Sequence, residues 1–175
     1  MADGPDEADG VAGRVADTAK AVAAGIGETI EVMPCDPALA DTATFCEAYG
    51  VALEDSANTI VVVGKSDPPR HAACVVLATA RLDVNGAVRR RLEVRKASFA
   101  GADETAALTG MAIGGVTPFA LPAGLPLWID AAVMARPSVV VGGGSRSAKL
   151  LVAPAVLAAL PGAEVVDGLA RPIEP

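Results

Sequence analysis

Apolar residues recur along this chain in two periods, one typical of helices and the other of strands. Val11, Val15, Ala19 and Val22 are three or four residues apart, which predicts an amphipathic helix that ends near Gly25. Runs of β-branched and other apolar residues predict short strands instead. We expect these strands at residues 29–33, 59–63, 72–79, 125–129, 138–141, 149–152 and 164–166.

Capping residues mark the shorter helices. Asp41 is a suitable N-cap for a helix that carries Phe45 and Tyr49, and Gly50 closes that helix. Further helices are expected at residues 102–108 and 154–160, and a helix or turn starts at residues 83–86. Because short strands are interspersed with short helices, the pattern predicts a mixed α/β or α+β domain.

The composition is that of a globular chain. Its 175 residues suffice for one domain with a full core, and 52% of them are hydrophobic and 20% charged. We expect an acidic, disordered tail at residues 1–10 and a single domain over residues 11–175. The polar, acidic start excludes a secretory signal, and no apolar run approaches about 18 residues. The expected location is therefore the cytoplasm, without a membrane partner.

The net charge limits the contacts that the chain can make with nucleic acid. A formal charge of −7 weighs against a broad basic surface that coats nucleic acid, but it leaves room for local contact with one end. The basic residues form two groups, Arg89, Arg90, Arg91, Arg95 and Lys96 in one and Arg146 and Lys149 in the other. The larger group is the best place to meet phosphates, although such a run is usually a solvated helix face.

Cysteine and histidine are too few and too irregularly spaced for a metal site. Cys35, Cys46 and Cys74 form no C-x-x-C pair, and a zinc site needs about four ligands with short paired spacing. We therefore expect no metal and no cofactor, and cysteines that are reduced and buried. The single histidine, His71, would have to be the base of any catalytic triad, and its place beside two prolines favours a solvated or structural role.

The segment most informative about chemistry is residues 114–119, G-G-V-T-P-F. Glycine permits positive φ and a close approach of the backbone to a ligand, and Pro118 locks the loop. Backbone N–H groups held in such a loop are suited to stabilise a developing oxyanion or to grip a small polar group. A tight turn between two strands is the alternative.

A second glycine-rich segment, residues 142–147 (G-G-G-S-R-S), follows a β-branched strand. It lacks the G-x-x-x-x-G-K-[ST] spacing of a P-loop, so nucleotide hydrolysis has little support. Its N–H groups and the guanidinium of Arg146 are still donors for a phosphate or carboxylate. A hairpin turn with solvated polar residues is an equally good interpretation.

Three segments carry a resemblance to a known family. The first is residues 56–62, S-A-N-T-I-V-V. The second is residues 108–119, which join L-T-G to the G-G-V-T-P-F loop. The third combines residues 127–130, L-W-I-D, with the glycine triplet and the Ser145-Arg146 pair after it. Together they resemble the YbaK/ProX family, the free-standing relatives of the editing domain inserted in bacterial prolyl-tRNA synthetases. Order and spacing agree over residues 30–168, nearly the whole globular part.

The resemblance implies both a fold and a reaction. The fold is a strongly twisted mixed sheet, partly closed like a barrel and surrounded by helices. The reaction is hydrolysis of the ester of a mischarged aminoacyl-tRNA that carries a small amino acid such as alanine, cysteine or serine, often on tRNA for proline. Such editing is needed because a synthetase pocket rejects a slightly smaller side chain by only about 1–3 kcal/mol. The implied partners are the aminoacyl-tRNA 3′ end and an aminoacyl-tRNA synthetase, and monomer and homodimer both remain open.

By the same resemblance, the 114–119 loop lines the aminoacyl pocket and supplies the oxyanion contacts. Water or the ribose hydroxyl of the terminal adenosine is positioned beside it, and no protein nucleophile is required. The expected catalytic residues are Gly114, Gly115, Thr117 and Asn58. The expected substrate-binding residues are Val116, Pro118, Phe119, Asp130, Gly143, Gly144, Ser145 and Arg146.

Asn58 departs from the family pattern, because most members carry a lysine at that place in the buried strand. Asparagine offers two donors and an acceptor without charge, so electrostatic help is lost there. Lys65 and Arg70 are the nearest cations along the chain. The alternative function is therefore a catalytically weak or inactive relative that binds an aminoacyl or nucleotide group, or a synthetase partner.

Overall fold

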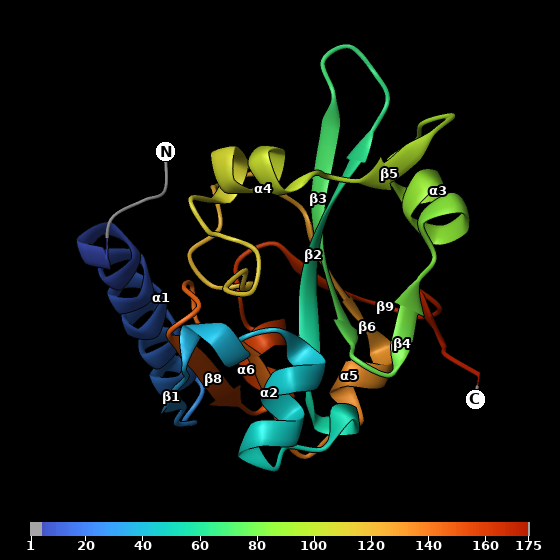
Figure 1. The fold of residues 1–175 in the computed structure, drawn as a ribbon. Coiled ribbons are helices and arrows are strands. Elements are labelled where there is room, and N and C mark those ends of the chain that lie inside the picture. Colours follow the sequence, from blue (N-terminus) through green and yellow to red (C-terminus); the bar gives the residue numbers. More distant parts are fainter. Residues whose placement is uncertain (1–4, 175) are drawn as a thin grey trace.

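A computed structural model describes residues 5–174, in which helices and strands alternate (Figure 1). The helices are α1 (Pro5–Gly25), α2 (Thr42–Tyr49), α3 (Arg89–Arg91), α4 (Ala102–Thr109), α5 (Ala131–Met134) and α6 (Pro154–Ala158). The strands are β1 (Glu31–Pro34), β2 (Ala57–Gly64), β3 (Arg70–Leu77), β4 (Ala80–Leu82), β5 (Ala97–Phe99), β6 (Leu127–Asp130), β7 (Val139–Gly142), β8 (Ala148–Val152), β9 (Ala163–Val166) and β10 (Ala170–Pro172). The expected mixed α+β class is confirmed. None of the described helices has the length and apolar character needed to span a membrane.

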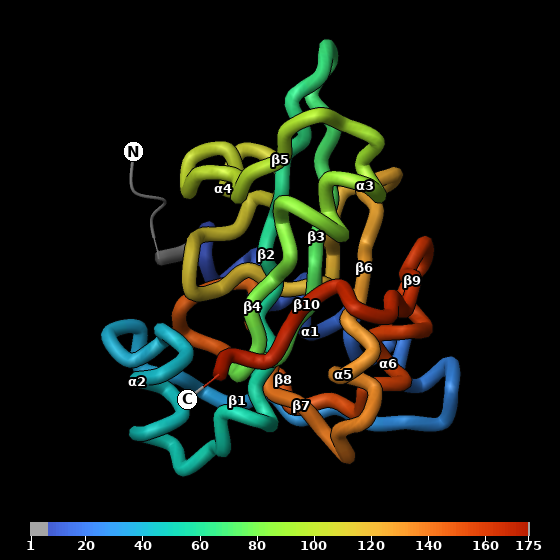
Figure 2. Tube along the Cα trace, turned by 90° about the vertical axis from the view of Figure 1, so that its right-hand side faces the viewer, coloured from blue at the N-terminus to red at the C-terminus, as the bar shows by residue number. Residues whose placement is uncertain are grey.

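A mixed five-stranded sheet in the order β5-β2-β3-β6-β9 crosses the centre of the molecule. Strands β2 and β3 pair antiparallel over their whole length, from Ala57 opposite Leu77 to Gly64 opposite Arg70. The pairs β3–β6 and β6–β9 are parallel. Figure 2 shows β2 and β3 running side by side, with β6 and β9 beyond them.

Two smaller sheets accompany the central one. One is antiparallel and has the order β1-β8-β7, and the other pairs β10 with β4. A single parallel bridge from Ser56 to Val140 connects the start of β2 to β7. Within the described residues the three sheets stay open, so the partial barrel closure implied by the family resemblance is not found. The mixed sheet surrounded by helices, which the resemblance also implies, is found.

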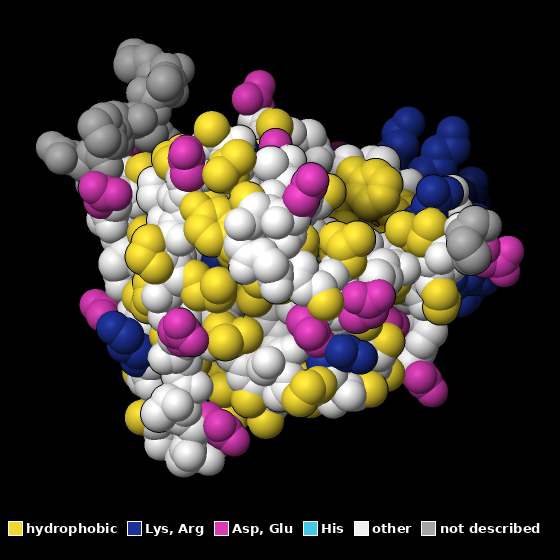
Figure 3. Space-filling model, turned by 60° about the horizontal axis from the view of Figure 1, so that its bottom comes forward, with side chains coloured by type: hydrophobic (Ala, Val, Ile, Leu, Met, Phe, Trp, Pro, Cys, Tyr) yellow, Lys and Arg dark blue, Asp and Glu magenta, His cyan; other side chains and the backbone are white. Residues whose placement is uncertain are grey.

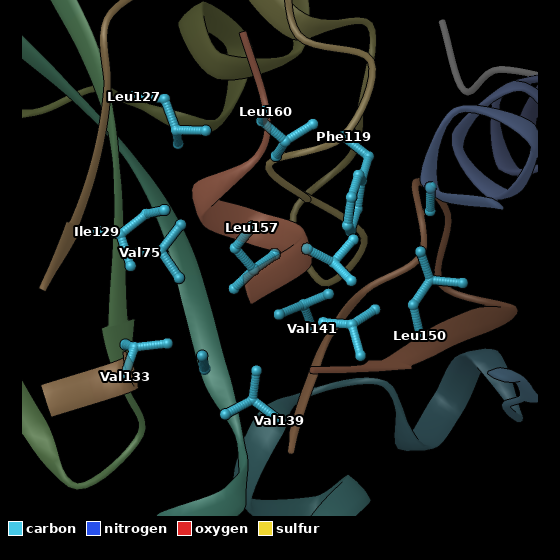
Figure 4. Close-up of a cluster of buried hydrophobic side chains, with 14 of the residues drawn as sticks. Val75, Phe119, Leu127, Ile129, Val133, Val139, Val141, Leu150, Leu157 and Leu160 are labelled. Atoms are coloured by element: carbon cyan, nitrogen blue, oxygen red, sulfur yellow. The ribbon is translucent and has the colours of Figure 1, made fainter. Parts of the chain in front are cut away.

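Strand β3 is apolar from Ala72 to Leu77 because this part lies between two core clusters. Side chains alternate between the two faces of a strand. Ala73 and Val75 face the larger cluster, whereas Ala72 and Cys74 face the second. Figure 4 shows the larger cluster, in which side chains of β6, β7, β8 and α6 gather around Val75. Burial on both faces explains why the sequence shows a continuous apolar run here rather than alternation.

Helix α1 begins earlier than the sequence pattern suggested. Val15 and Ala19 are fully buried against the larger cluster, which confirms the amphipathic spacing. Residues 5–10, which we expected to be disordered, form the first turns of this helix, and residues 1–4 of the expected tail lie outside the described residues. Pro5 suits the first helical position, where the missing N–H would have had no intrahelical partner.

Most of the shorter elements agree with their local signals. Helix α2 begins after Asp41 and ends at Gly50, which has a left-handed φ of 69°. Within it, the rings of Phe45 and Tyr49 stack with centroids 4.7 Å apart. Strands β4, β5 and β10 and helix α5 were not expected, because three or four residues are too few to show a period.

Candidate active site

A cavity of about 330 Å³ opens beside the first half of β2, where the neighbouring strand stops. Strand β5 pairs only with residues 62–64 of β2. In the described structure, the edge formed by residues 57–61 therefore has no partner strand, although the Val61 carbonyl oxygen accepts a hydrogen bond from the Ala100 N–H. An unpaired strand edge presents free N–H and C=O groups. Residues 57–61 form one wall of the cavity.

Thr59 offers unused polar groups in this wall. Backbone groups of alternate strand residues point to the same edge, so those of Thr59 point the same way as the Val61 carbonyl that meets Ala100. The Thr59 hydroxyl is buried and has no hydrogen-bond partner among residues 5–174. Because buried polar atoms are normally paired, these groups are suited to receive a polar ligand.

Asn58 lines the cavity, as we expected, and is held by the helix that covers it. Its Oδ1 accepts a hydrogen bond of 2.6 Å from the Thr42 hydroxyl at the start of α2. Its amide N–H groups have no partner in the part of the chain that the structure describes. Lys65 and Arg70, the cations nearest in sequence, do not line the cavity, and Arg70 instead donates to the Leu92 carbonyl.

Lys149 of β8 brings a buried cation to the cavity. Only 7% of the residue is exposed, and its Nζ donates to the carbonyl oxygens of Ala40 at 2.7 Å and Gly114 at 3.0 Å. The ring centroid of Phe45 lies 5.5 Å from the same atom. Gly142 is opposite Lys149 in the β7–β8 register and has no side chain to occupy the space. Desolvation lowers the pKa of Lys149 from its ordinary value.

The loop that follows α4 docks on the turn between β7 and β8. Gly115 donates its N–H to the Ala112 carbonyl at 2.9 Å, and its own carbonyl accepts from the Gly144 N–H at 2.8 Å. A β-carbon on Gly115 would lie 2.6 Å from the carbonyl carbon of Ser145, closer than such atoms approach. The segment links α4 to β6, so it is not the turn between two strands that we considered as the alternative.

Gly114 and Val116 are the loop residues that reach the cavity. Gly114 has a φ of 93°, which favours glycine. The N–H groups of Gly114 and Val116 have no partner among the described residues, whereas that of Gly115 is bonded to Ala112. Gly114 and Val116, rather than Gly115, are therefore the loop residues whose N–H groups are available to an oxyanion.

Four residues expected at the site lie away from the cavity wall. Thr117 and Phe119 are fully buried, and Phe119 belongs to the larger core cluster (Figure 4). Pro118 lines a separate, mainly apolar hollow of about 610 Å³. Asp130 is buried at the end of β6 and accepts a 3.1 Å hydrogen bond from the Ala170 N–H. Packing and the attachment of β10 account for these positions, and the expected contact of all four residues with the substrate stays a prediction.

The glycine triplet lies where β7 ends and the turn to β8 begins, as the hairpin interpretation anticipated. Gly144 has a φ of 92° and packs on Val15 of α1, where a β-carbon would overlap the valine side chain. Gly143 is equally confined, by the backbone of Ala148. The buried Ser145 hydroxyl oxygen accepts from the N–H of the second residue after it. Gly143, Gly144 and Ser145 support the loop from behind and do not line the cavity.

Arg146 ties three segments together at the mouth of the cavity. Its Nε donates to the Pro37 carbonyl at 2.9 Å, and its Nη1 donates to Asp41 Oδ1 and to the Ile113 carbonyl, both at 3.1 Å. Asp41 and Ile113 line the cavity, so the guanidinium connects the β7–β8 turn to both rims. A contact from Arg146 to the terminal nucleotide stays a prediction.

The histidine and the cysteines lie outside the cavity. His71 Nε2 is 2.8 Å from Glu104 Oε1, and Cys35, Cys46 and Cys74 are buried free thiols. The part of the cavity wall that the structure describes has hydroxyls, an amide, an ammonium and the carboxylate of Asp41, but neither imidazole nor thiol. This wall can orient a polar substrate and stabilise developing negative charge.

The sequence grouped Lys149 with Arg146 as a pair of basic residues and did not indicate that Lys149 lines the cavity. The available signal was its position inside the apolar stretch A-K-L-L-V, in the strand that we predicted. A lysine within such an apolar strand is either buried or at the edge of the sheet. The other cavity residues that were missed carry no motif; they include Thr42, Thr59, Ala100, Thr105 and Ile113.

Comparisons with known proteins relate the chain to one family. Residues 36–160 match a family model described as the aminoacyl-tRNA editing domain. Among solved structures, a candidate trans-editing enzyme for prolyl-tRNA synthetase is similar at 27% identity with a TM-score of 0.75, over 90% of this chain and 95% of that chain. Hypothetical protein APE2540 is similar at 26% identity with a TM-score of 0.74, over 85% of this chain and 95% of that chain.

Proposed function

The chain belongs to the aminoacyl-tRNA editing domain family, and we propose that it hydrolyses the ester of a mischarged tRNA that carries a small amino acid. Family membership makes aminoacyl-tRNA deacylation the activity. Alanine, serine and cysteine are the proposed amino acids. The similarity to a candidate trans-editing enzyme for prolyl-tRNA synthetase supports tRNA for proline as the carrier, and that synthetase as the partner.

The observation that carries the proposal is the cavity at the open edge of β2. At about 330 Å³ it lies near the lower end of the range for ligand pockets, so a small aminoacyl group suits it. Its polar groups include donors that have no partner among residues 5–174: the N–H groups of Gly114 and Val116, and the amide N–H groups of Asn58. An ester carbonyl needs such donors, and it needs them most when charge develops on its oxygen.

The reaction requires only water and positioned donors. The water oxygen adds to the carbonyl carbon of the ester, and negative charge develops on the carbonyl oxygen. The bond from this carbon to the ribose oxygen then breaks, and the ribose oxygen takes the proton that the water gives up. A free amino acid and a tRNA with a free terminal hydroxyl are formed. The ribose hydroxyl beside the ester is the proposed proton carrier, since the described part of the cavity wall supplies no imidazole.

The 3′ end of the tRNA enters at the cavity mouth, and its phosphates meet the larger basic group. Figure 3 shows Lys and Arg side chains gathered at one edge of the molecule, with acidic side chains scattered over the rest of that face. Arg89, Arg90, Arg95 and Lys96 are exposed, and no side-chain partner is found for them in the described residues. Arg91 differs, because it pairs with Glu164 and lies over the Trp128 ring.

A deacylation screen tests the proposal. Each tRNA of a full set is charged with its own or with a small, wrong amino acid and incubated with the protein, and the release of labelled amino acid is followed. We expect faster release than in buffer for a small amino acid on tRNA for proline, and little release of proline itself.

Two valine variants test whether deacylation takes place in the cavity. Val116→Phe fills the cavity and should abolish release, whereas Val165→Phe enlarges an exposed side chain on β9 and should leave release unchanged. If no charged tRNA loses its amino acid faster than in buffer, deacylation is refuted and a binding role replaces it.

A further inference from the structure

We infer that Lys149 binds the carbonyl oxygen of the aminoacyl ester and is a catalytic residue of this chain. The inference rests on the proposed function. It assigns the cavity's positive charge to a residue of β8, whereas Asn58 of β2, which lines the same cavity, has no charge.

The hydrogen bonds of Lys149 leave one donor for a ligand. An ammonium group has three N–H donors. Two of them are taken by the Ala40 and Gly114 carbonyl oxygens, at 2.7 and 3.0 Å. The third has no partner among residues 5–174, and Lys149 lines the cavity. An oxygen atom of a bound ligand is therefore positioned to complete the group.

The same contacts connect the ammonium to the glycine loop. The carbonyl of Gly114 is bonded to Lys149, which fixes the orientation of the peptide that follows Gly114. Val116, whose N–H is unpaired among the described residues, lies beside Gly142, the residue opposite Lys149 in the β7–β8 register. A charged donor and a backbone donor are thus brought to one cavity, which is the arrangement that stabilises an oxyanion.

The burial of Lys149 determines which oxygen of the charged tRNA its ammonium group binds. The residue is 7% exposed and the Phe45 ring lies on one side of its Nζ. A phosphodiester carries a full charge and keeps its hydration best at the surface, where exposed arginines are available. A small acyl group loses little by entering a partly apolar cavity. The ester carbonyl is therefore the group expected at Lys149, and the phosphates are expected outside.

The test distinguishes binding of Lys149 to the acyl group from binding of Lys149 to the phosphates. The probes are two short RNAs that end in CCA: one carries alanine through a stable amide on the terminal ribose, and the other has a free terminal hydroxyl. Binding of each is titrated with wild type, Lys149→Met and Lys20→Met, the last being an exposed lysine of α1 that serves as control. Lys149→Met should weaken binding of the acylated RNA by about 10-fold or more, as for loss of a charged hydrogen bond. Binding of the uncharged RNA should change less than about 2-fold, and Lys20→Met should change neither.

A relocation variant distinguishes a ligand role from a structural one. Asn58→Lys combined with Lys149→Met returns an ammonium to the same cavity from β2. We expect it to restore binding of the acylated RNA, and to recover at least about 10-fold of a deacylation rate that falls about 100-fold in Lys149→Met. Melting curves establish that each variant is folded.

Each outcome has a distinct meaning. Equal weakening of both RNAs by Lys149→Met places the ammonium on a phosphate, and unchanged binding of both makes Lys149 a structural anchor; either result overturns the inference while the proposed function stands. Failure of the relocation variant in a folded protein also overturns it. If wild type neither binds the acylated RNA nor deacylates any charged tRNA, the proposed function itself fails.

Discussion

The guanidinium of Arg146 occupies the space where residue 114 would carry a β-carbon. A β-carbon built on Gly114 overlaps Arg146 Nη1, the atom that donates to both Asp41 and Ile113. The absence of a side chain at this point lets one arginine cross the loop and join both rims of the cavity.

Gly114→Ala should therefore destabilise the protein in two ways. Alanine at a φ of 93° is strained by about 1–3 kcal/mol, and its methyl group displaces Arg146. Urea unfolding measures the loss. In an Arg146→Ala background the second contribution disappears, so the two changes should be coupled by about 0.5 kcal/mol or more. Strict additivity would show that the arginine simply moves aside.

Gly115→Ala should disconnect the loop from the β7–β8 turn. The added methyl group would lie 2.6 Å from backbone atoms of Ser145, which cannot rotate away as a side chain can. A shift of the loop by about 1 Å costs on the order of 100-fold in rate, so we expect that loss of deacylation. Gly25→Ala, at an exposed helical position with no atom nearby, is the matched control. Retained activity in Gly115→Ala would show that the loop is not part of the site.

Removal of two exposed arginines should weaken tRNA binding through its dependence on salt. In Arg89→Gln/Arg90→Gln, each phosphate contact that is lost should reduce the slope of log affinity against log salt by about 1. The control, Arg14→Gln/Lys20→Gln on α1, has the same charge change on a different face. An identical slope in both double variants would mean that only net charge matters.

Cys74 should make the folded protein less stable at high pH. Burial raises the pKa of Cys74 from 9.0 to about 12, despite the opposing charge of Arg91. Between these values the unfolded chain loses the thiol proton and the folded chain keeps it, so stability falls as pH rises; below 9.0 the thiol has no effect. By about pH 10.5 the thiol should cost roughly 2 kcal/mol.

The measurement compares urea unfolding of wild type and Cys74→Ala at neutral and alkaline pH. The variant has a constant deficit from the lost sulfur contacts, and the difference between the two proteins should shrink as pH rises. A difference that does not vary with pH would mean that Cys74 ionises equally in both states.

The local signals were reliable where a single segment decides the outcome. The spacing of Val11, Val15 and Ala19 predicted α1, and Asp41 and Gly50 marked the ends of α2, because helical period and caps depend on neighbours in sequence. The expected disorder of residues 5–10 was wrong, because a short polar segment can form the first turns of a helix whose later turns are buried. Its own residues do not show that burial.

The sequence likewise predicted only part of the candidate site. Asn58, Gly114 and Val116 were identified by motif and do line the cavity, but Phe119, in the same motif, belongs to the core. A motif shows that residues act together without showing which of them support the site and which face the ligand. That distinction depends on burial.

Local patterns along the chain were sufficient to predict the period and ends of most elements, the glycines that the loop and turn require, and the resemblance to an editing family. The folded chain was needed to show that β5 stops beside residue 62, leaving the edge of β2 open, and that the pairing of β8 with β7 brings Lys149 to the same cavity as Asn58. The two kinds of information differ in their range along the sequence. Propensities and caps act over a few residues, whereas strand pairing and the burial of a charge depend on segments that meet only when the chain is folded.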